Sequence, residues 1–221
     1  MTDDPLRMFL VVRRGAVTGL DRSAQLAGAA AVACVREFAD LPELAEWRPR
    51  PGKVCLRARN RAQWEGVLEE PHVVVDDAVA ALPPRRRSER GPLLEKLQAM
   101  STDLGPPPES VPPLRPGSSG APAGPAAEWR LVYVLNPRCP MSSGKVLAQV
   151  AHAAVMAAEA LPEWADAGCP AHLVAPGEAA FAELERSGEG VARVVDAGLT
   201  EVPAGTVTVI ALGDFLDGRA R

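Results

Sequence analysis

Short apolar runs alternate with alanine-rich segments along most of the chain. The continuous runs at 8–13 and 130–135 predict strands that are buried on both faces. A helix is expected after each run, and the second, at 145–161, has no internal proline and ends just before Pro162. Further strands are predicted at 171–175, 191–195 and 206–212, with a helix at 178–186 between the first two. Strands that alternate with helices in this way predict an α/β sandwich, a mixed sheet of four strands covered by helices on both faces.

The N-terminal half repeats this order, which predicts two tandem α/β sandwiches. Ala24-Gln-Leu-Ala-Gly-Ala-Ala matches Ala148-Gln-Val-Ala-His-Ala-Ala, and each is followed by Leu-Pro-Glu and a tryptophan. The repeat looks degenerate, because no run corresponds to the closing strand at 206–212, and a helix is expected at 92–100 instead. Its other predicted elements are the strands 53–57 and 73–75 and the helix 61–68.

Residues 105–127 are mostly Pro, Gly, Ser and Ala and have no hydrophobic periodicity, so they predict an extended linker. The predicted organisation is a degenerate domain at 1–104, this linker, and a second domain at 128–221. The N-terminus carries two acidic residues and only a short apolar run, which predicts a cytoplasmic protein with no signal peptide and no membrane segment.

The distribution of charge and the spacing of cysteines and histidines limit the kinds of binding site that the chain can form. The net charge is −4, and residues 1–127 hold 17 basic and 16 acidic residues whereas residues 128–221 hold 7 and 12, so any basic surface is expected in the N-terminal half. The four cysteines and three histidines form no recognised ligand spacing, which argues against a metal site or a disulfide framework.

The start of the helix at 145–161 carries the first candidate motif. Lys145, Gln149 and His152 follow one another at spacings of four and three, so they share one helix face, which we expect to look outward from the sheet. Such a stripe is usually a solvated face. A lysine near the positive end of the helix dipole is unfavourable, however, and its position there suggests a function.

The second motif, Val194-Val-Asp-Ala-Gly-Leu-Thr, runs from a strand into a glycine turn. It places Asp196 at the carboxyl edge of the sheet, where open α/β folds hold their sites. Alone, Asp-Ala-Gly is more often a turn with an Asx hydrogen bond than a catalytic centre.

Together, Met-x-x-Gly-Lys-x-x-Ala-Gln-x-Ala-His-Ala and the later Asp-Ala-Gly-x-Thr-x-x-x-x-Gly-Thr resemble the type-two peptidyl-tRNA hydrolases, across about 128–213. The resemblance implies hydrolysis of the ester between a peptide and the 3′ ribose of tRNA, with peptidyl-tRNA as the partner and no cofactor. The catalytic residues that it implies are Lys145, Asp196 and His152, and the substrate-binding residues are Gln149, Thr200 and Gly144. Replacing Lys145 or Asp196 by Ala is expected nearly to abolish turnover while the midpoint of thermal unfolding stays close to that of the wild type.

The chain departs from that family at Asn136 and Arg138, where members usually carry Arg and an Asp-Leu pair. In the N-terminal copy, Asp21 stands for Lys145, Gly28 stands for His152, and Asp77 lies near the position of Asp196, which predicts an inert half. The resemblance also implies pairing of the two halves as an internal pseudo-dimer. Candidates for an RNA-binding surface are Arg13, Arg14, Arg48, Arg50, Arg57, Arg59, Arg61 and Arg85 to Arg87, with a merely solvated face as the alternative.

Two other hypotheses for the function stay open. The chain is either an active hydrolase or a non-catalytic RNA- or protein-binding module that keeps the fold, and a hydrolase with another acyl substrate would use the same residues. A P-loop is excluded, because Cys139 stands where that motif needs glycine. Cys139 as a nucleophile has no base placed for it by the sequence.

Overall fold

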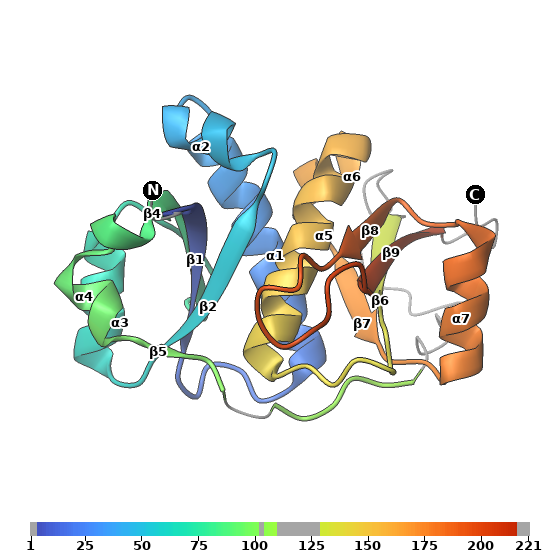
Figure 1. Cartoon of the computed structure of the whole chain (residues 1–221). Helices are drawn as coiled ribbons and strands as arrows, with labels where there is room; N and C mark the ends of the chain where they lie inside the picture. The colour runs from blue at the N-terminus through green and yellow to red at the C-terminus, as the bar shows by residue number, and fades with distance from the viewer. Residues whose placement is uncertain (1–3, 102–103, 110–128, 216–221) are drawn as a thin grey trace, which may run out of the picture.

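The computed structural model describes residues 4–101, 104–109 and 129–215, and it is an α/β protein with two mixed sheets, as predicted (Figure 1). Most of the predicted linker, residues 110–127, lies outside the described residues. The elements of the N-terminal half are β1 (Leu6–Arg13), α1 (Leu20–Glu37), α2 (Pro42–Trp47), β2 (Gly52–Ala58), α3 (Arg61–Glu69), β3 (Val73–Val75), β4 (Val79–Arg86), a single 3₁₀ turn (Arg87–Glu89), α4 (Gly91–Lys96) and β5 (Gln98–Ala99). Those of the C-terminal half are β6 (Trp129–Leu135), α5 (Ser143–Ala160), α6 (Pro162–Asp166), β7 (Ala171–Val174), α7 (Glu178–Ser187), β8 (Ala192–Val195) and β9 (Val207–Phe215).

The two sheets repeat one topology. The C-terminal sheet has the strand order β7-β6-β9-β8, and four strands of the N-terminal sheet follow the same order, β2-β1-β4-β3, with β5 added at the edge. The strand directions agree as well, because β1–β2 and β6–β7 are parallel pairs while β1–β4 and β6–β9 are antiparallel. The similarity of the halves in sequence therefore extends to their fold.

The expectation that the N-terminal half has no closing strand is wrong, because β4 occupies the place of β9. Pro83 and Pro84 hid it, since proline cannot donate to a sheet ladder. Both fall where the register of β4 against β1 shifts, and β3 pairs only with Val79 to Ala81, so the far side of the prolines has no strand to bond. The helix expected at 92–100 is also shorter, because the chain leaves α4 at Lys96 and forms β5 against β2.

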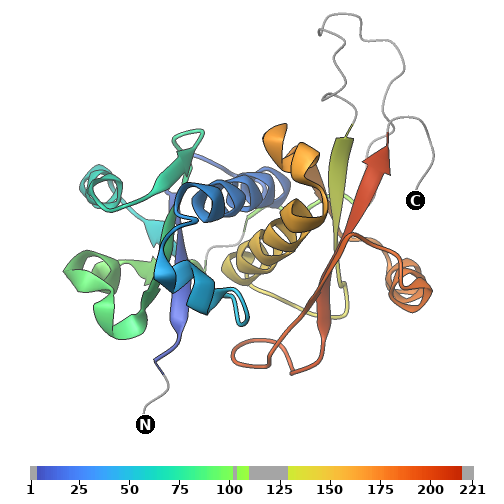
Figure 2. The same ribbon diagram turned by 90° about the horizontal axis from the view of Figure 1, so that it is seen from above.

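Helices α1 and α5 lie against each other between the two sheets (Figure 2). One continuous apolar core includes both helices and the inner faces of both sheets. Along β1, Met8 and Leu10 face this core while Phe9 and Val11 face a second cluster beneath α3 and α4. In the C-terminal half α7 covers the outer face of the sheet through Phe181. Each sheet thus has helices on both faces, as predicted.

Small residues let α1 and α5 approach closely. A Cβ added at Gly28 would lie 3.1 Å from the Cβ of Ala154 and 3.2 Å from the hydroxyl oxygen of Tyr133. Polar contacts cross between the halves at the rim of this packing. They are Arg36 to Asp166 at 2.7 Å, Arg48 to Glu159 at 2.6 Å, and the Leu173 amide to Asp21 at 2.6 Å. Exposed ion pairs add little stability, so the buried apolar surface holds the halves together.

Half of the arginines proposed for an RNA-binding surface are neutralised by acidic neighbours. The pairs are Arg13 with Asp77, Arg48 with Glu159, Arg61 with Glu65, Arg85 with Glu70, and Arg86 with Glu46. A phosphate would have to compete with these carboxylates. The structure therefore favours the solvated-face interpretation for those five arginines.

Candidate active site

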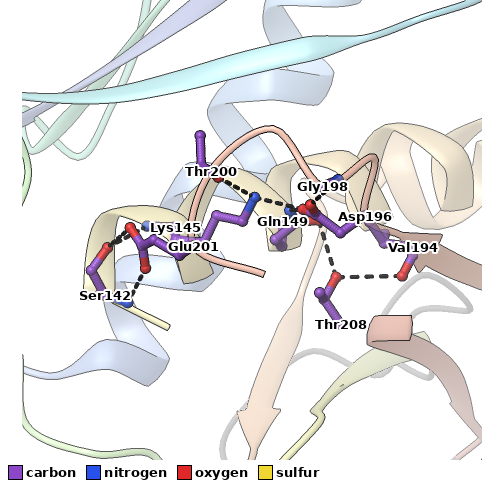
Figure 3. Close-up of polar contacts among 9 residues, drawn as sticks. All are labelled: Ser142, Lys145, Gln149, Val194, Asp196, Gly198, Thr200, Glu201 and Thr208. Carbon is purple, nitrogen blue, oxygen red and sulfur yellow. Dashed lines mark hydrogen bonds and ion pairs between the residues drawn. The ribbon is translucent and has the colours of Figure 1, made fainter. Parts of the chain in front are cut away.

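The start of α5 and the turn after β8 are tied together by Glu201. Ser142 caps the helix, because its hydroxyl accepts a hydrogen bond from the Lys145 amide at 3.3 Å. The amide and the hydroxyl of Ser142 each donate to the Glu201 carboxylate at 2.7 Å (Figure 3). The two motifs, about fifty residues apart in sequence, are therefore held side by side.

Asp196 follows β8 directly and begins the turn. Its Oδ1 accepts a hydrogen bond from the Gly198 amide at 2.8 Å, which is the Asx turn expected of Asp-Ala-Gly. Gly198 has φ +75°, and a Cβ there would lie 2.6 Å from the Ala204 nitrogen, so only glycine fits. The turn fixes one carboxylate oxygen and leaves the other directed at α5.

The second carboxylate oxygen of Asp196 accepts hydrogen bonds from two of the candidate site residues. Lys145 Nζ donates to Oδ2 at 2.5 Å, and Gln149 Nε2 donates to the same atom at 2.6 Å (Figure 3). Lys145 also donates to Thr200 Oγ1 at 2.8 Å. The hydroxyl of Thr208 donates to Gln149 Oε1 at 3.1 Å and so fixes the orientation of the amide. Four residues predicted from the two motifs thus form one hydrogen-bonded group.

The expectation that the Lys-Gln-His stripe looks outward is wrong. Gln149 is buried, and the Lys145 side chain is only 13% exposed. The turn after β8 covers Lys145 and Gln149, and the N-terminal half packs against α5 through β2 and the α2–β2 turn. Lys145 and Gln149 are therefore covered by the second motif of their own half, and of the three residues His152 is the one that lies against the N-terminal half.

His152 and Gly144 lie apart from the four-residue group. His152 makes no hydrogen bond within the described residues and lines a cavity of about 330 Å³ between α5 and the α2–β2 turn. Burial and the nearby Lys53 charge lower the pKa of the imidazole to about 3, against the opposing effect of Asp196. Gly144 is buried against the backbone of Met100, where any side chain would collide. Its binding of substrate stays a prediction, and the structure gives it a packing role.

The pKa of the Asp196 carboxyl is shifted downward. Burial raises it, but the Lys145 hydrogen bond and charge, with those from the Gly198 amide and Gln149, outweigh burial and lower the pKa below 3.8. A lowered folded pKa stabilises the fold above the unfolded value of about 3.9, and this contribution is lost as pH falls through the folded pKa. Asp196 is therefore ionised at neutral pH.

This shift predicts a pH dependence of stability. The difference in unfolding free energy between wild type and Asp196→Asn should be constant from pH 7 to about 5 and should shrink as pH falls below about 4. Urea unfolding at each pH measures it. Asp166→Asn removes an exposed carboxylate paired with Arg36 and serves as the matched control, with a smaller change. A pH-independent difference for Asp196→Asn would contradict the lowered pKa.

Sequence reasoning missed Thr208 and Glu201. Thr208 is fully buried in β9 and holds Gln149, yet in the sequence it is one β-branched residue within a strand. Glu201 lies inside the second motif, and the motif gave no reason to expect its carboxylate at the helix start. Asn136 and Arg138, where the chain departs from the family pattern, both make contacts that support the fold. Asn136 donates to the Val207 carbonyl at 2.8 Å, and Arg138 pairs with Glu185 at 2.6 Å.

The N-terminal half keeps a partial copy of the group. Asp76, and not Asp77, is the residue that follows β3 directly as Asp196 follows β8. It pairs with Arg22, the third residue of α1, as Lys145 is the third residue of α5, and Arg22 also donates to Gln25. Arg22 and Asp76 are about half exposed, and a guanidinium stays protonated. The inertness of this half stays a prediction.

Two further readings of the site are limited by the structure. Burial raises the pKa of the Cys139 thiol, which disfavours a nucleophilic thiolate. In the part of the chain that the structure describes, no three His, Cys, Asp or Glu side chains gather to hold a metal ion. Among the described helices, none has both the length and the apolar character to cross a membrane.

Comparison with known proteins finds relatives of the C-terminal half. The family model described as "Peptidyl-tRNA hydrolase PTH2" matches residues 129–215. The chain is 39% identical over 98 residues to "Peptidyl-tRNA hydrolase" of Thermococcus onnurineus, which covers 38% of this chain and 83% of that protein. It is 35% identical over 99 residues to the protein of the same name in Staphylothermus marinus, covering 39% and 82%.

A mammalian relative is matched over a smaller share of its length. The chain is 35% identical over 103 residues to "Peptidyl-tRNA hydrolase 2, mitochondrial" of Bos taurus, and the match covers 41% of this chain and 58% of the bovine protein. No solved structure matches the chain.

Proposed function

The chain belongs to the PTH2 family of peptidyl-tRNA hydrolases through its C-terminal half, and we propose that this half hydrolyses the ester that joins a peptide to the 3′ ribose of tRNA. The observation that carries the proposal is the buried contact between Lys145 and Asp196, held by residues of both motifs. The substrate is peptidyl-tRNA or a related N-acylaminoacyl-tRNA, and the products are the free peptide and tRNA.

The chemistry requires an oriented water and a positive charge where the carbonyl oxygen becomes negative. Asp196 is ionised and accepts a hydrogen bond from that water. Lys145, with the amides at the start of α5, stabilises the oxyanion. Gln149 and Thr200 hold Asp196 and Lys145 and bind the substrate by hydrogen bonds.

His152 supplies the proton transfer in this proposal. The imidazole is neutral at physiological pH, the form that can accept a proton from the water, although burial and the Lys53 charge, which lower its pKa, also weaken it as a base. The same proton can then pass to the 3′ oxygen of the leaving ribose. Every group that acts in these reaction steps is a side chain, a backbone amide or water, so the proposed reaction needs no cofactor.

The halves are assigned different tasks. We propose residues 128–221 as the hydrolase domain, residues 1–104 as its non-catalytic copy, and 105–127 as the linker. The packing of α1 on α5 supports an internal pseudo-dimer. A cytoplasmic location stays part of the proposal, and three of the relatives are named as mitochondrial.

Release of free tRNA from N-acetylaminoacyl-tRNA by the purified protein tests the proposal. We expect multiple turnovers with this ester and little hydrolysis of a small acyl ester such as p-nitrophenyl acetate. Preference for the small ester would indicate a hydrolase with another acyl substrate. A folded protein that binds N-acetylaminoacyl-tRNA but does not hydrolyse its ester would support the non-catalytic binding module.

A further inference from the structure

Apolar side chains make up most of the wall of the cavity beside His152. They are Trp47, Pro49, Pro51, Val155, Met156 and Val195. Val195 immediately precedes Asp196, and His152 lines the same cavity from α5. Since the proposed mechanism places the ester carbonyl among Asp196, Lys145 and His152, the cavity opens beside the carbon that water attacks.

The charged residues of the lining leave little for an ionic ligand to bind. Arg48 is paired with Glu159 at 2.6 Å. Arg193 directs its guanidinium to α7, where Nη1 donates to the Glu185 carbonyl at 2.9 Å, and its Nη2 is shielded from solvent. An ionic ligand would have to separate the Arg48 pair or lose its hydration without compensation, whereas a neutral apolar ligand requires neither. The lining therefore favours an apolar occupant.

Trp47 forms a wall that is fixed before any ligand arrives. Its indole nitrogen donates to the Gly52 carbonyl at 2.7 Å, and Lys53 Nζ lies 4.6 Å from the ring centroid. Trp47 is buried and backs the cavity, whose exposed wall includes Pro49 and Val195. A preformed apolar wall loses little conformational freedom when a ligand binds, which favours affinity.

Exposed apolar surface gathers on the turn that carries Asp196. Among the described residues three large apolar side chains are exposed, and two of them, Val195 at 53% and Leu199 at 74%, lie on either side of Asp196 in the chain. A single exposed side chain of this kind is common, but two on one turn beside a candidate site fit contact with an apolar ligand. Val195 places part of this surface in the cavity.

We propose that this cavity receives the side chain of the amino acid whose ester to tRNA is cleaved, so that the protein prefers esters of bulky apolar residues. The inference rests on the proposed function and adds to it a selectivity for the C-terminal residue of the peptide. The α-carbon that carries this side chain is bonded directly to the attacked carbonyl carbon, so the side chain starts beside His152 and Val195. The cavity volume of about 330 Å³ is at the low end of the roughly 300–1,000 Å³ typical of small-molecule sites, which leaves room for one side chain.

The proposal assigns a task to the N-terminal half. Trp47, Pro49 and Pro51 form the wall that faces α5, and all three lie outside residues 129–215, which the family model matches. The selectivity is therefore expected from the second half of this chain and not from the shared hydrolase fold. The C-terminal half cleaves the ester, and the N-terminal half helps to choose the amino acid.

One tRNA acylated with different N-acetylamino acids tests this, because only the side chain then differs between substrates. We expect kcat/KM for the N-acetylphenylalanyl and N-acetylleucyl esters to exceed that for the N-acetylalanyl ester by about tenfold, the discrimination typical of filling an apolar pocket. The N-acetylaspartyl ester should be cleaved more slowly than the alanyl ester. Each rate is divided by the uncatalysed rate of the same ester, which removes differences in intrinsic reactivity.

Two variants of Met156 change the cavity without altering the catalytic group. Met156→Trp fills it from α5, and Met156→Gln keeps the length of the side chain but adds a polar amide. We expect each to lower the ratio of kcat/KM for the phenylalanyl ester to that for the alanyl ester by about fivefold. Ala160→Trp adds the same indole at an exposed position of α5 outside the cavity and should keep the wild-type ratio. Because the ratio compares two substrates of one protein, partial unfolding of a variant does not change it.

Pro49→Asp tests the wall that comes from the other half. A carboxylate at this exposed position of the lining should attract a cationic side chain. We expect kcat/KM for the N-acetyllysyl ester to rise by about threefold relative to the phenylalanyl ester, the size typical of an exposed ion pair. Loss of structure cannot produce such a gain.

The outcomes separate this inference from the proposed function. Equal cleavage of the phenylalanyl and alanyl esters by the wild-type protein would overturn the cavity inference while leaving an active hydrolase in place. The inference would also fail if both Met156 variants kept the wild-type ratio, since the side chain would then bind elsewhere. Absence of hydrolysis with every tRNA ester would refute the proposed function and the inference with it.

Discussion

Lys145→Met and Asp196→Asn are each expected to lower the turnover of N-acetylaminoacyl-tRNA by about a thousandfold, the size typical of removing a charged group that acts in the transition state. Both substitutions keep the side-chain size and remove the charge. In the proposed mechanism Lys145→Met removes the cation that stabilises the developing oxyanion. Asp196→Asn replaces the acceptor that orients water by an amide. Single-turnover release of tRNA measures both effects.

The isosteric pair is a sharper test than alanine. The side chains of Lys145 and Asp196 are 13% and 5% exposed, so removing either charge leaves the other buried without its partner, and truncation to alanine adds a cavity that the isosteric change avoids. Such a change typically costs about 3–5 kcal/mol of stability. The expectation from sequence, that alanine variants unfold near the wild-type temperature, therefore needs revision. Loss of activity in an alanine variant would not separate chemistry from folding.

Controls come from a pair outside the site. Arg36→Met and Asp166→Asn break an exposed ion pair between the halves and should leave turnover within about twofold of wild type. The double variant Lys145→Met/Asp196→Asn should lose little more activity than either single variant, since the two groups act as one unit. Turnover within about tenfold of wild type in both single variants would refute the assigned roles.

The sequence was most informative where local chemistry decides the structure. The helix expected at 145–161 is found at Ser143–Ala160, because helix propensity and the following Pro162 act locally. Strand β3 falls on the three valines predicted for it. By contrast β4 carries two prolines, and only its pairing with β1, a long-range contact, makes it a strand. Propensity cannot report such tertiary compensation.

In the candidate site, too, local motifs predicted the residues but not the long-range packing around them. Lys145, Gln149, Asp196 and Thr200 could be predicted from two motifs, and the structure joins them by hydrogen bonds. What the motifs could not predict is the environment that the other half imposes. Helical periodicity indicates which residues share a face, but which surface covers that face depends on how two sheets dock. Lys53, from β2, lies beside His152 for that reason alone.

Gly28→Leu is expected to lower the unfolding free energy by about 3 kcal/mol, because the space at that position is already filled. A Cβ at Gly28 would already lie 3.1 Å from the Ala154 Cβ and 3.2 Å from the Tyr133 hydroxyl, so the remaining leucine carbons have no room. For a chain of this length, the midpoint of thermal unfolding should fall by roughly 10 °C. Differential scanning calorimetry measures both quantities.

Two matched variants isolate the cause. Gly28→Ala adds only the Cβ, and its gain of about 1 kcal/mol in helix propensity offsets the tight contact, so we expect stability close to wild type. Gly66→Leu places leucine in α3, where the nearest atoms belong to the flexible Leu93 side chain, and should be tolerated. Wild-type stability for Gly28→Leu would mean that α1 and α5 do not pack closely in solution.

Gly28 also stands where the C-terminal half has His152. An imidazole at that position of α1 would meet the same Ala154 and Tyr133 contacts as leucine, so we expect Gly28→His to be destabilising as well. Glycine at this position therefore lets α1 lie against α5, and this packing brings β2, with Lys53, beside His152.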